Sequence, residues 1–268
     1  MHLTDRDFAR LRDFMYQNYG INLEKKRTLI EGRLAIIVKQ KGYDDFGAYV
    51  DNLMADKSGS EVSVLVSRLT TNFTYFMREE EHFQFLKDAA LPNIVPKIRD
   101  GNLCIWSAGC SSGEEPYSLA MVLDDYFKNG KHGLDTKILA TDISQRVLSN
   151  AVEGTYPKDR ISRVSDQWTK KYFKKLDNGK YQVRPELKKE VIFREFNLME
   201  PSFNFKRKFH VIFCRNVMIY FDNKTRGELA KRFYNALAPG GYLIIGLSET
   251  LVNQNTGFRY VRPSIYQK

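Results

Sequence analysis

The stretch Ile105–Met121, IWSAGCSSGEEPYSLAM, decides the fold class. A short apolar run leads into a turn of small residues, where Gly109 and Gly113 allow backbone conformations that other residues rarely adopt. Pro116 suits the first turn of the helix that follows. A strand, a tight small-residue turn and a helix in this order predict a nucleotide-cofactor loop in an open α/β sheet.

Two acids, Glu114 and Glu115, stand at the start of that helix. A dinucleotide loop seats a pyrophosphate at a helix N-terminus, where carboxylates would repel it. We therefore expect a ligand that is cationic or carries hydroxyl groups. Taken alone, the segment is explained equally well by a tight turn whose glutamates favour the helix dipole.

Bulk properties exclude several classes of protein. The chain has 268 residues, enough for one large domain or two unequal ones. Three cysteines without paired spacing and four scattered histidines predict reduced thiols and no metal site. The first residues carry acids, unlike a signal peptide, and no apolar run approaches the length that spans a membrane. We expect a cytoplasmic protein that does not insert into the membrane.

Positive charge is concentrated in one region. The net charge is +10, and residues 158–189 hold eleven Lys or Arg against four acids. Smaller basic clusters lie at residues 25–27 and 206–208. Such patches suit nucleic acid, an anionic membrane or an acidic protein, although a single cluster is more often solvated surface.

Apolar periodicity divides the chain. Residues 1–90 have helical spacing and predict an N-terminal helical domain, and 91–102, with two prolines and a glycine, predict a linker. From 103 to 268 short apolar runs alternate with helical stretches, which predicts a mostly parallel sheet with helices on both faces. Within it, Asn178-Gly179 predicts a hairpin turn in a β insertion at about 168–191.

Polar side chains follow three of the expected strands. Asp142 ends KILATD, where a carboxylate can accept ribose hydroxyls, although Asp is also a common helix cap. Asn197 and Leu198 follow VIFREF, where an amide and an apolar side chain can contact an adenine, or can form an ordinary strand-end turn. Arg215 and Asn216 follow HVIFC, where binding clefts gather such residues, or where an arginine lies on the surface beside a capped helix.

Several segments in one order resemble the CheR family, the chemoreceptor glutamate methyltransferases of bacterial chemotaxis. The segments are TTNFTYFMRE, AGCSSGEEPYS, ATDIS, FNL, CRNVMIYFD and the LAPGGYLIIGLSE hairpin. The resemblance spans nearly the whole chain. It implies an α/β S-adenosylmethionine-dependent methyltransferase fold, with a Rossmann-like, mostly parallel sheet, a small N-terminal all-helical domain and a small β insertion.

The resemblance also implies the cofactor, S-adenosyl-L-methionine, and the product S-adenosyl-L-homocysteine. This donor has a sulfonium and no phosphate, in agreement with the acids of the glycine loop. By family position Glu115, rather than Glu114, is the contacting acid. The residues implied to bind the cofactor are Asn72, Thr74, Arg78, Glu115, Asp142, Asn197, Leu198, Arg215 and Asn216.

The acceptors implied are glutamate side chains of chemoreceptors, which become methyl esters in sensory adaptation. A glutamate is ionised near pH 7, so its attack needs no general base, and rate should come from alignment and exclusion of water. We expect Arg78 and Tyr220 to be the catalytic residues that hold the reactants.

The partner implied is the cytoplasmic helical bundle of a chemoreceptor, steered by the basic residues 25–27 and by the basic insertion. The hairpin LDNGK is shorter than in family members that tether to a receptor's C-terminal pentapeptide, so we expect no such tether. We also expect a monomer that does not bind nucleic acid.

Two other interpretations stay open. A nucleic-acid methyltransferase would suit the charge, but the chain lacks an Asn-Pro-Pro-aromatic quartet and a Pro-Cys pair. A non-catalytic receptor-binding module of the same fold would have lost cofactor positions, yet each has a suitable side chain. An NAD oxidoreductase is disfavoured by the glycine loop.

Overall fold

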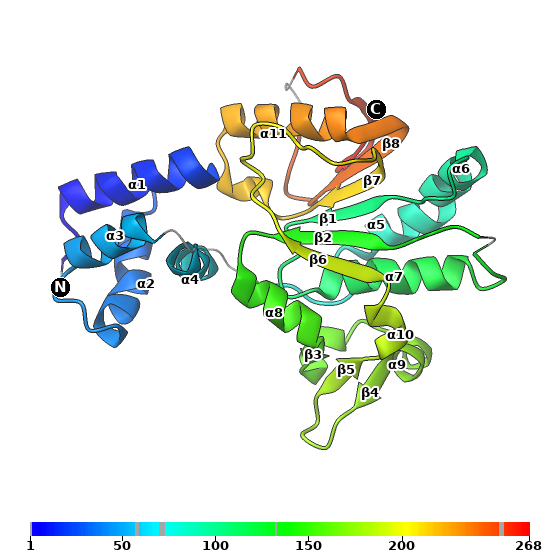
Figure 1. Cartoon of the computed structure of the whole chain (residues 1–268), viewed down its shortest axis with the longest axis horizontal. Coiled ribbons are helices and arrows are strands. Elements are labelled where there is room, and N and C mark those ends of the chain that lie inside the picture. The colour runs from blue at the N-terminus through cyan, green and yellow to red at the C-terminus, as the bar shows by residue number, and fades with distance from the viewer. Residues whose placement is uncertain (1, 57–58, 70–72, 132, 252–254) are drawn as a thin grey trace.

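A seven-stranded sheet forms the centre of the protein, in the order β6-β2-β1-β7-β8-β10-β9 (Figure 1). The computed structural model describes residues 2–56, 59–69, 73–131, 133–251 and 255–268. The pairs from β6 to β8 are parallel, and β10 and β9 are antiparallel. The strands are β1 (Ile105–Ala108), β2 (Ile138–Asp142), β6 (Val191–Glu195), β7 (Phe209–Cys214), β8 (Leu237–Ile245), β9 (Arg259–Arg262) and β10 (Ile265–Gln267). The predicted mostly parallel α/β sheet is confirmed.

Helices cover both faces of this sheet, because successive side chains of a strand point to opposite sides. Ile105 packs in one apolar cluster with helix α7 (Glu114–Tyr126), and its neighbour Trp106 packs in another with α11 (Asn223–Ala236). All four residues of β1 are buried, which explains why the strand is apolar except for Ser107, whose hydroxyl donates to Glu115.

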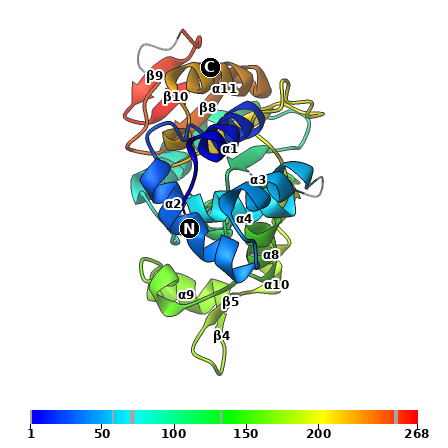
Figure 2. The same cartoon turned by 90° about the vertical axis from the view of Figure 1, so that its left-hand side faces the viewer.

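Four helices form a separate bundle beside the sheet (Figures 1 and 2). They are α1 (Asp5–Tyr19), α2 (Arg27–Gln40), α3 (Phe46–Ala55) and α4 (Ser60–Leu69). The Thr4 side chain caps α1 by accepting from the Asp7 N–H, and Gly20 ends that helix in the left-handed conformation. The predicted N-terminal helical domain is confirmed. Within the described residues, no helix is long and apolar enough to cross a membrane.

The helices that follow residue 79 belong with the sheet. They are α5 (Glu80–Phe85), the π-helical turn η1 (Leu86–Ala90), α6 (Leu91–Ile94) and the short η2 (Val95–Lys97). Their apolar residues share the cluster of Ile105 and α7. The sequence placed the domain boundary near residue 90, because helical spacing does not reveal which surface a helix covers. We propose a boundary near residue 70 instead.

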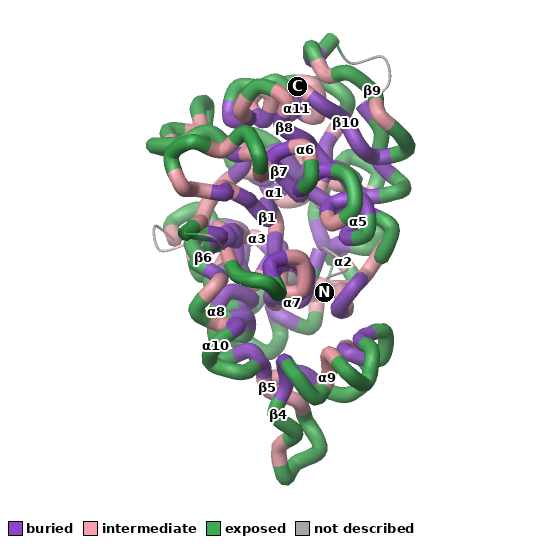
Figure 3. Tube along the Cα trace, turned by 90° about the vertical axis from the view of Figure 1, so that its right-hand side faces the viewer, coloured by how far each residue is buried: buried purple, intermediate pink, exposed green. Residues whose placement is uncertain are grey.

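The predicted β insertion forms a three-stranded antiparallel sheet, in the order β3-β5-β4, that projects from the sheet domain. The elements between β2 and β6 are α8 (Gln145–Glu153), β3 (Thr155–Tyr156), η3 (Lys158–Ile161), α9 (Asp166–Tyr172), β4 (Phe173–Lys175), β5 (Tyr181–Val183) and α10 (Pro185–Lys188). Gly179 has a φ of 77° in the turn between β4 and β5. Figure 3 shows that the tip of this hairpin is exposed.

The expected hairpin at residues 237–249 is wrong. Residues Leu237–Ile245 form the single strand β8, parallel to β7. The register shifts between Phe209 and Val211 of β7, so that β8 holds an irregularity in the part that contains Pro239, Gly240 and Gly241. A β-bulge and a hairpin turn use the same residue types.

The helical domain docks on the loops that follow the parallel strands. The Asn22 N–H donates to the Tyr220 carbonyl over 2.9 Å. The Asn197 side chain donates to the Asn18 carbonyl over 2.8 Å. The turn at Gly20 packs closely, since a Cβ built there would lie 2.4 Å from Met199 Sδ.

Gly20→Ala tests this docking. We expect lower thermal stability and weaker ligand binding in the cavity at this interface, because the methyl group would displace the Met199 side chain and would lie 3.0 Å from Thr225 Cγ2. The matched control is Gly42→Ala, since Gly42 has a similar φ of 74° with nothing within 4 Å of the added Cβ. Both variants lose about 1 kcal/mol through the left-handed backbone. Equal melting temperatures and affinities in calorimetry would contradict the docking role.

Candidate active site

A cavity of about 500 Å³ lies where the loops after the parallel strands meet the helical domain. This is the edge at which open α/β sheets bind ligands. The helical domain contributes Tyr19, Ile21 and Val66 to its wall. The cavity is also lined by the predicted residues Thr74, Arg78, Glu115, Asp142, Asn197, Leu198, Arg215, Asn216 and Tyr220. Asn72 lies outside the described residues.

The conformation of the glycine loop depends on packing against neighbouring residues as much as on any ligand. Gly109 has a φ of 85°, and a Cβ there would lie 2.4 Å from Val217 Cγ2. Gly113, at the start of α7, has a φ of 96°, and a Cβ would lie 2.9 Å from Ala151 Cβ. The small residues therefore allow the loops after β1 and β7 to pack together, which the sequence alone did not indicate.

Asp142 presents its carboxylate to the cavity from the end of β2. One oxygen accepts from the Ser111 N–H at 2.9 Å, and the other accepts from the Ser144 N–H at 3.0 Å. Burial raises the pKa of Asp142, and the backbone N–H groups oppose this shift. A carboxylate accepts about four hydrogen bonds, so capacity for hydroxyl groups remains.

The two acids of α7 point in different directions. Glu115 lines the cavity, where it accepts from the Ser107 hydroxyl at 2.7 Å and from Arg215 Nη1 at 3.0 Å. Glu114 accepts from the Ser112 hydroxyl at 2.7 Å and pairs with Arg160 at 3.4 Å. Burial raises the pKa of both acids. Glu115 is thus the acid of the glycine loop that reaches the cavity.

Arg215 is buried and is held by the protein itself, with its side chain 2% exposed. Its Nη1 donates to Glu115, while Nε and Nη2 donate to Glu79 Oε2 at 3.3 and 3.1 Å. Nη2 also donates to the carbonyl of Arg78, and the guanidinium lies 5.3 Å from the centre of the Phe83 ring. Although Arg215 lines the cavity, its main role is to hold Glu115, Glu79 and the Arg78 carbonyl in place.

Arg78 has fewer contacts within the described part of the chain. Its Nη1 donates to the Phe73 carbonyl at 2.7 Å, its Nε lies 4.0 Å from Glu79 Oε1, and 29% of its side chain is exposed. This is the cation that remains accessible to a ligand carboxylate. Tyr220 lines the cavity nearby, and Lys26 Nζ lies 5.3 Å from the centre of its ring.

Asn197 and Leu198 enter the cavity wall together. The Asn197 side chain donates to the Asn18 carbonyl and accepts from the Met199 N–H at 2.9 Å, which uses half of the capacity of an amide. Asn197 therefore fixes the helical domain to the sheet domain, and its predicted contact with an adenine stays a prediction. Leu198 is buried, as an apolar wall requires.

Sequence reasoning missed two acids of this site. Glu79 accepts from Arg215, from Asn216 Nδ2 at 3.3 Å and from the Leu247 N–H at 3.4 Å. Glu249 accepts from the N–H groups of Asn216 at 2.9 Å and Ile219 at 3.1 Å. Their position directly after Arg78 and after the last parallel strand was the available signal. Within the described residues, no group of three or more His, Cys, Asp or Glu could hold a metal ion.

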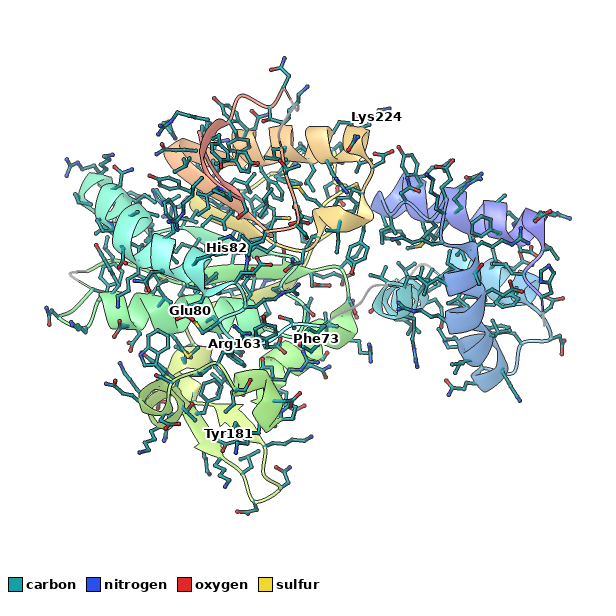
Figure 4. The ribbon with its side chains drawn as sticks, turned by 180° about the vertical axis from the view of Figure 1, so that it is seen from behind. Phe73, Glu80, His82, Arg163, Tyr181 and Lys224 are labelled. Atoms are coloured by element: carbon teal, nitrogen blue, oxygen red, sulfur yellow. The ribbon has the colours of Figure 1, made fainter. Side chains whose placement is uncertain are left out.

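His82 extends this network on helix α5 (Figure 4). Its Nε2 lies 2.7 Å from Ser264 Oγ, and its Nδ1 lies 3.4 Å from Glu79 Oε2. Burial, and next the charge of Arg215, lower the pKa of His82 to about 4, although Glu79 acts in the opposite direction.

The free energy of unfolding at acid pH should depend on the buried His82. An unfolded histidine has a pKa of about 6.5. The unfolded chain therefore binds a proton between pH 6.5 and 4 that the folded chain does not, and the free energy of unfolding falls as the pH falls through this window. His82→Gln should remove up to ~3 kcal/mol of that fall, at ~1.4 kcal/mol per pKa unit. Denaturant unfolding from pH 8 to 4 measures the slope, and an unaltered slope in the variant would contradict this account.

Comparisons with known proteins agree with this geometry. Residues 72–266 match the model of the CheR methyltransferase SAM binding domain, and residues 6–70 match that of the CheR methyltransferase all-alpha domain. A chemotaxis protein methyltransferase of Borreliella burgdorferi is 45% identical over 100% of this chain and 96% of that protein. One of Salmonella typhimurium is 37% identical over 98% of this chain and 90% of that protein.

These matches cover nearly all of the chain, and the two family models meet near residue 70, where we place the domain boundary. The predictions of the family, the fold class and the cofactor S-adenosylmethionine are confirmed. The roles assigned to single cavity residues stay predictions. The chain belongs to the CheR methyltransferase family.

Proposed function

We propose that this protein transfers a methyl group from S-adenosylmethionine to glutamate side-chain carboxylates of bacterial chemoreceptors, forming methyl esters in sensory adaptation. One observation carries the proposal. The cavity at the strand ends combines two acids, Glu115 and Asp142, with the accessible cation Arg78. This combination suits a donor with cationic groups, ribose hydroxyls and a carboxylate, and it is hostile to phosphate.

The residues present fit this donor. The cavity volume lies in the range of small-molecule sites. Asp142 would accept the ribose hydroxyls, and Glu115 would attract the positively charged groups of the donor. Leu198, Ile143 and Phe196 offer an apolar wall for an adenine. When bound, the donor supplies a methyl group activated by a sulfonium.

The acceptor carboxylate is the nucleophile. Its oxygen would form a bond to the methyl carbon, and the electron pair of the breaking carbon–sulfur bond would stay on sulfur, so no proton would have to move. The protein's task is then alignment in a site from which water is partly excluded. Arg78 would hold a carboxylate by charge-assisted hydrogen bonds, and Tyr220 would position the acceptor.

The acceptor would be an acidic helical bundle in the cytoplasm. Lys26 lies over Tyr220 at the cavity, so this member of the basic cluster 25–27 is close to the proposed site of reaction. The exposed basic hairpin between β4 and β5 could add a second contact. Residues 176–180 alone connect those strands, and this short tip supports action without a pentapeptide tether. We also propose that the enzyme acts as a monomer.

A nucleic-acid methyltransferase is the second candidate, favoured by the basic insertion at residues 158–189. A non-catalytic receptor-binding module is a weaker one. The hydrogen-bonded acids and arginines of the cavity would have no use in such a module.

Glu115→Gln tests the donor site. The Ser107 hydroxyl can rotate to accept from the new amide, so the variant loses mainly the charge. We expect affinity for S-adenosylmethionine to fall by about 10- to 100-fold, the worth of a hydrogen bond between charged groups. The matched control is Glu114→Gln, whose side chain points away from the cavity. If calorimetry finds the larger loss of affinity in Glu114→Gln, the assignment of Glu115 as the contacting acid is wrong.

The acceptor is tested with methyl-labelled donor and three substrates: receptor membranes, DNA and RNA. We expect label on receptor protein as base-labile esters, lost in Arg78→Ala and retained in the exposed Arg99→Ala. Label on nucleic acid would favour the second candidate. A fully active Arg78→Ala enzyme would remove Arg78 from the reaction.

A further inference from the structure

Glu79 has an extensive set of contacts although it does not line the cavity. Its carboxylate accepts from Arg215, from the Asn216 side chain and from the Leu247 N–H, and it lies 3.4 Å from His82 Nδ1. Its side chain is 13% exposed. Burial would raise the pKa of Glu79, but the charge of Arg215 and the hydrogen bonds of Asn216 and Arg215 lower it. Glu79 is therefore an ionised acid behind the cavity wall.

Arg215 is shared between two acids. Two of its nitrogens donate to Glu79, and only Nη1 reaches Glu115. Arg78 Nε also lies 4.0 Å from Glu79 Oε1, but within the described residues Glu115 pairs with no cation except Arg215. Glu115, which lines the cavity, therefore shares its counter-ion with a second acid. If the pull of Glu79 were absent, the fork of the guanidinium could pair with both oxygens of Glu115 and neutralise it.

We propose that Glu79 is a positioning residue that draws Arg215 away from Glu115, so that the site distinguishes the positively charged donor from its neutral product. This inference rests on the proposed function. Methyl transfer converts a sulfonium into a thioether, so donor and product differ by one positive charge beside a nearly unchanged shape. A full negative charge on Glu115 favours the donor, whereas a neutral Glu115–Arg215 pair would bind both ligands alike.

The backbone around Glu79 is fixed by the same contacts. Met77 and Glu79 have φ values of 61° and 56°, a conformation that costs of order 1 kcal/mol or more in residues other than glycine. Arg78 stands between them, and its carbonyl accepts from Arg215. The Glu79–Arg215 pair thus also holds the strained turn that presents Arg78 to the cavity.

The test compares donor and product binding by calorimetry in the whole protein. For Glu79→Gln we expect affinity for S-adenosylmethionine to fall by about 10-fold and affinity for S-adenosylhomocysteine by less than about 3-fold, the difference produced by one charge near the wall. The matched control is Glu80→Gln, since Glu80 is the exposed neighbour at the start of α5 (Figure 4). Glu80→Gln should leave both affinities unchanged.

Two outcomes would overturn the inference: equal losses for both ligands, which indicate a merely structural residue, or no loss at all. If Glu79→Gln does not fold, Glu79→Asp replaces it, because Asp tolerates the left-handed backbone while its carboxylate stands farther from Arg215. The same reduced preference for the donor is expected there, and an unaltered preference would reject the proposal. If the unmodified protein bound neither ligand, the proposed function itself would fail, which keeps the two failures distinct.

Discussion

One buried cation connects the parts of the site. Arg215 follows β7, and its guanidinium joins Glu115 at the start of α7 to Glu79 and the Arg78 carbonyl in the turn before α5. A buried charge costs several kcal/mol of folding free energy unless it is paired and hydrogen-bonded. The need to pair Arg215 therefore fixes the positions of these segments. The positions of the glycine loop and of Arg78 are therefore coupled through this side chain rather than set independently.

The helical domain completes the cavity, because the strand-end loops alone form an open edge. Tyr19 and Ile21 enter its wall, and Asn197 and Tyr220 of the strand-end loops hydrogen-bond to the neighbouring Asn18 and Asn22. The same residues thus serve the domain interface and the site. A ligand bound between the two parts would contact both and would stabilise their docking by mass action.

The sequence predicted the features that depend on local pattern and failed where distant residues meet. The loop from Ile105 and the strand end at Asp142 follow from apolar runs and turn chemistry, and the structure places both at the cavity. Glu79 was missed because its partner Arg215 lies 136 residues away. The boundary near residue 90 stays a prediction, and we propose residue 70 instead, because α5 has helical spacing whichever domain it covers. The hairpin expected at residues 237–249 is instead the single strand β8, whose pairing with β7 holds a register shift.

The acids of this cavity face two opposing requirements. A site for a cationic donor needs ionised carboxylates, yet burial raises the pKa of Glu115 and Asp142 and favours their neutral forms. Asp142 is supported by backbone N–H groups, which favour the carboxylate without adding a net charge. Glu115 relies instead on the positive charge of Arg215. A pair formed by Glu115 and Arg215 alone would be neutral and would no longer attract a cationic donor. In the proposed arrangement Arg215 is shared with a second acid, so that its charge favours the ionised form of Glu115 without forming a neutral pair with Glu115 alone.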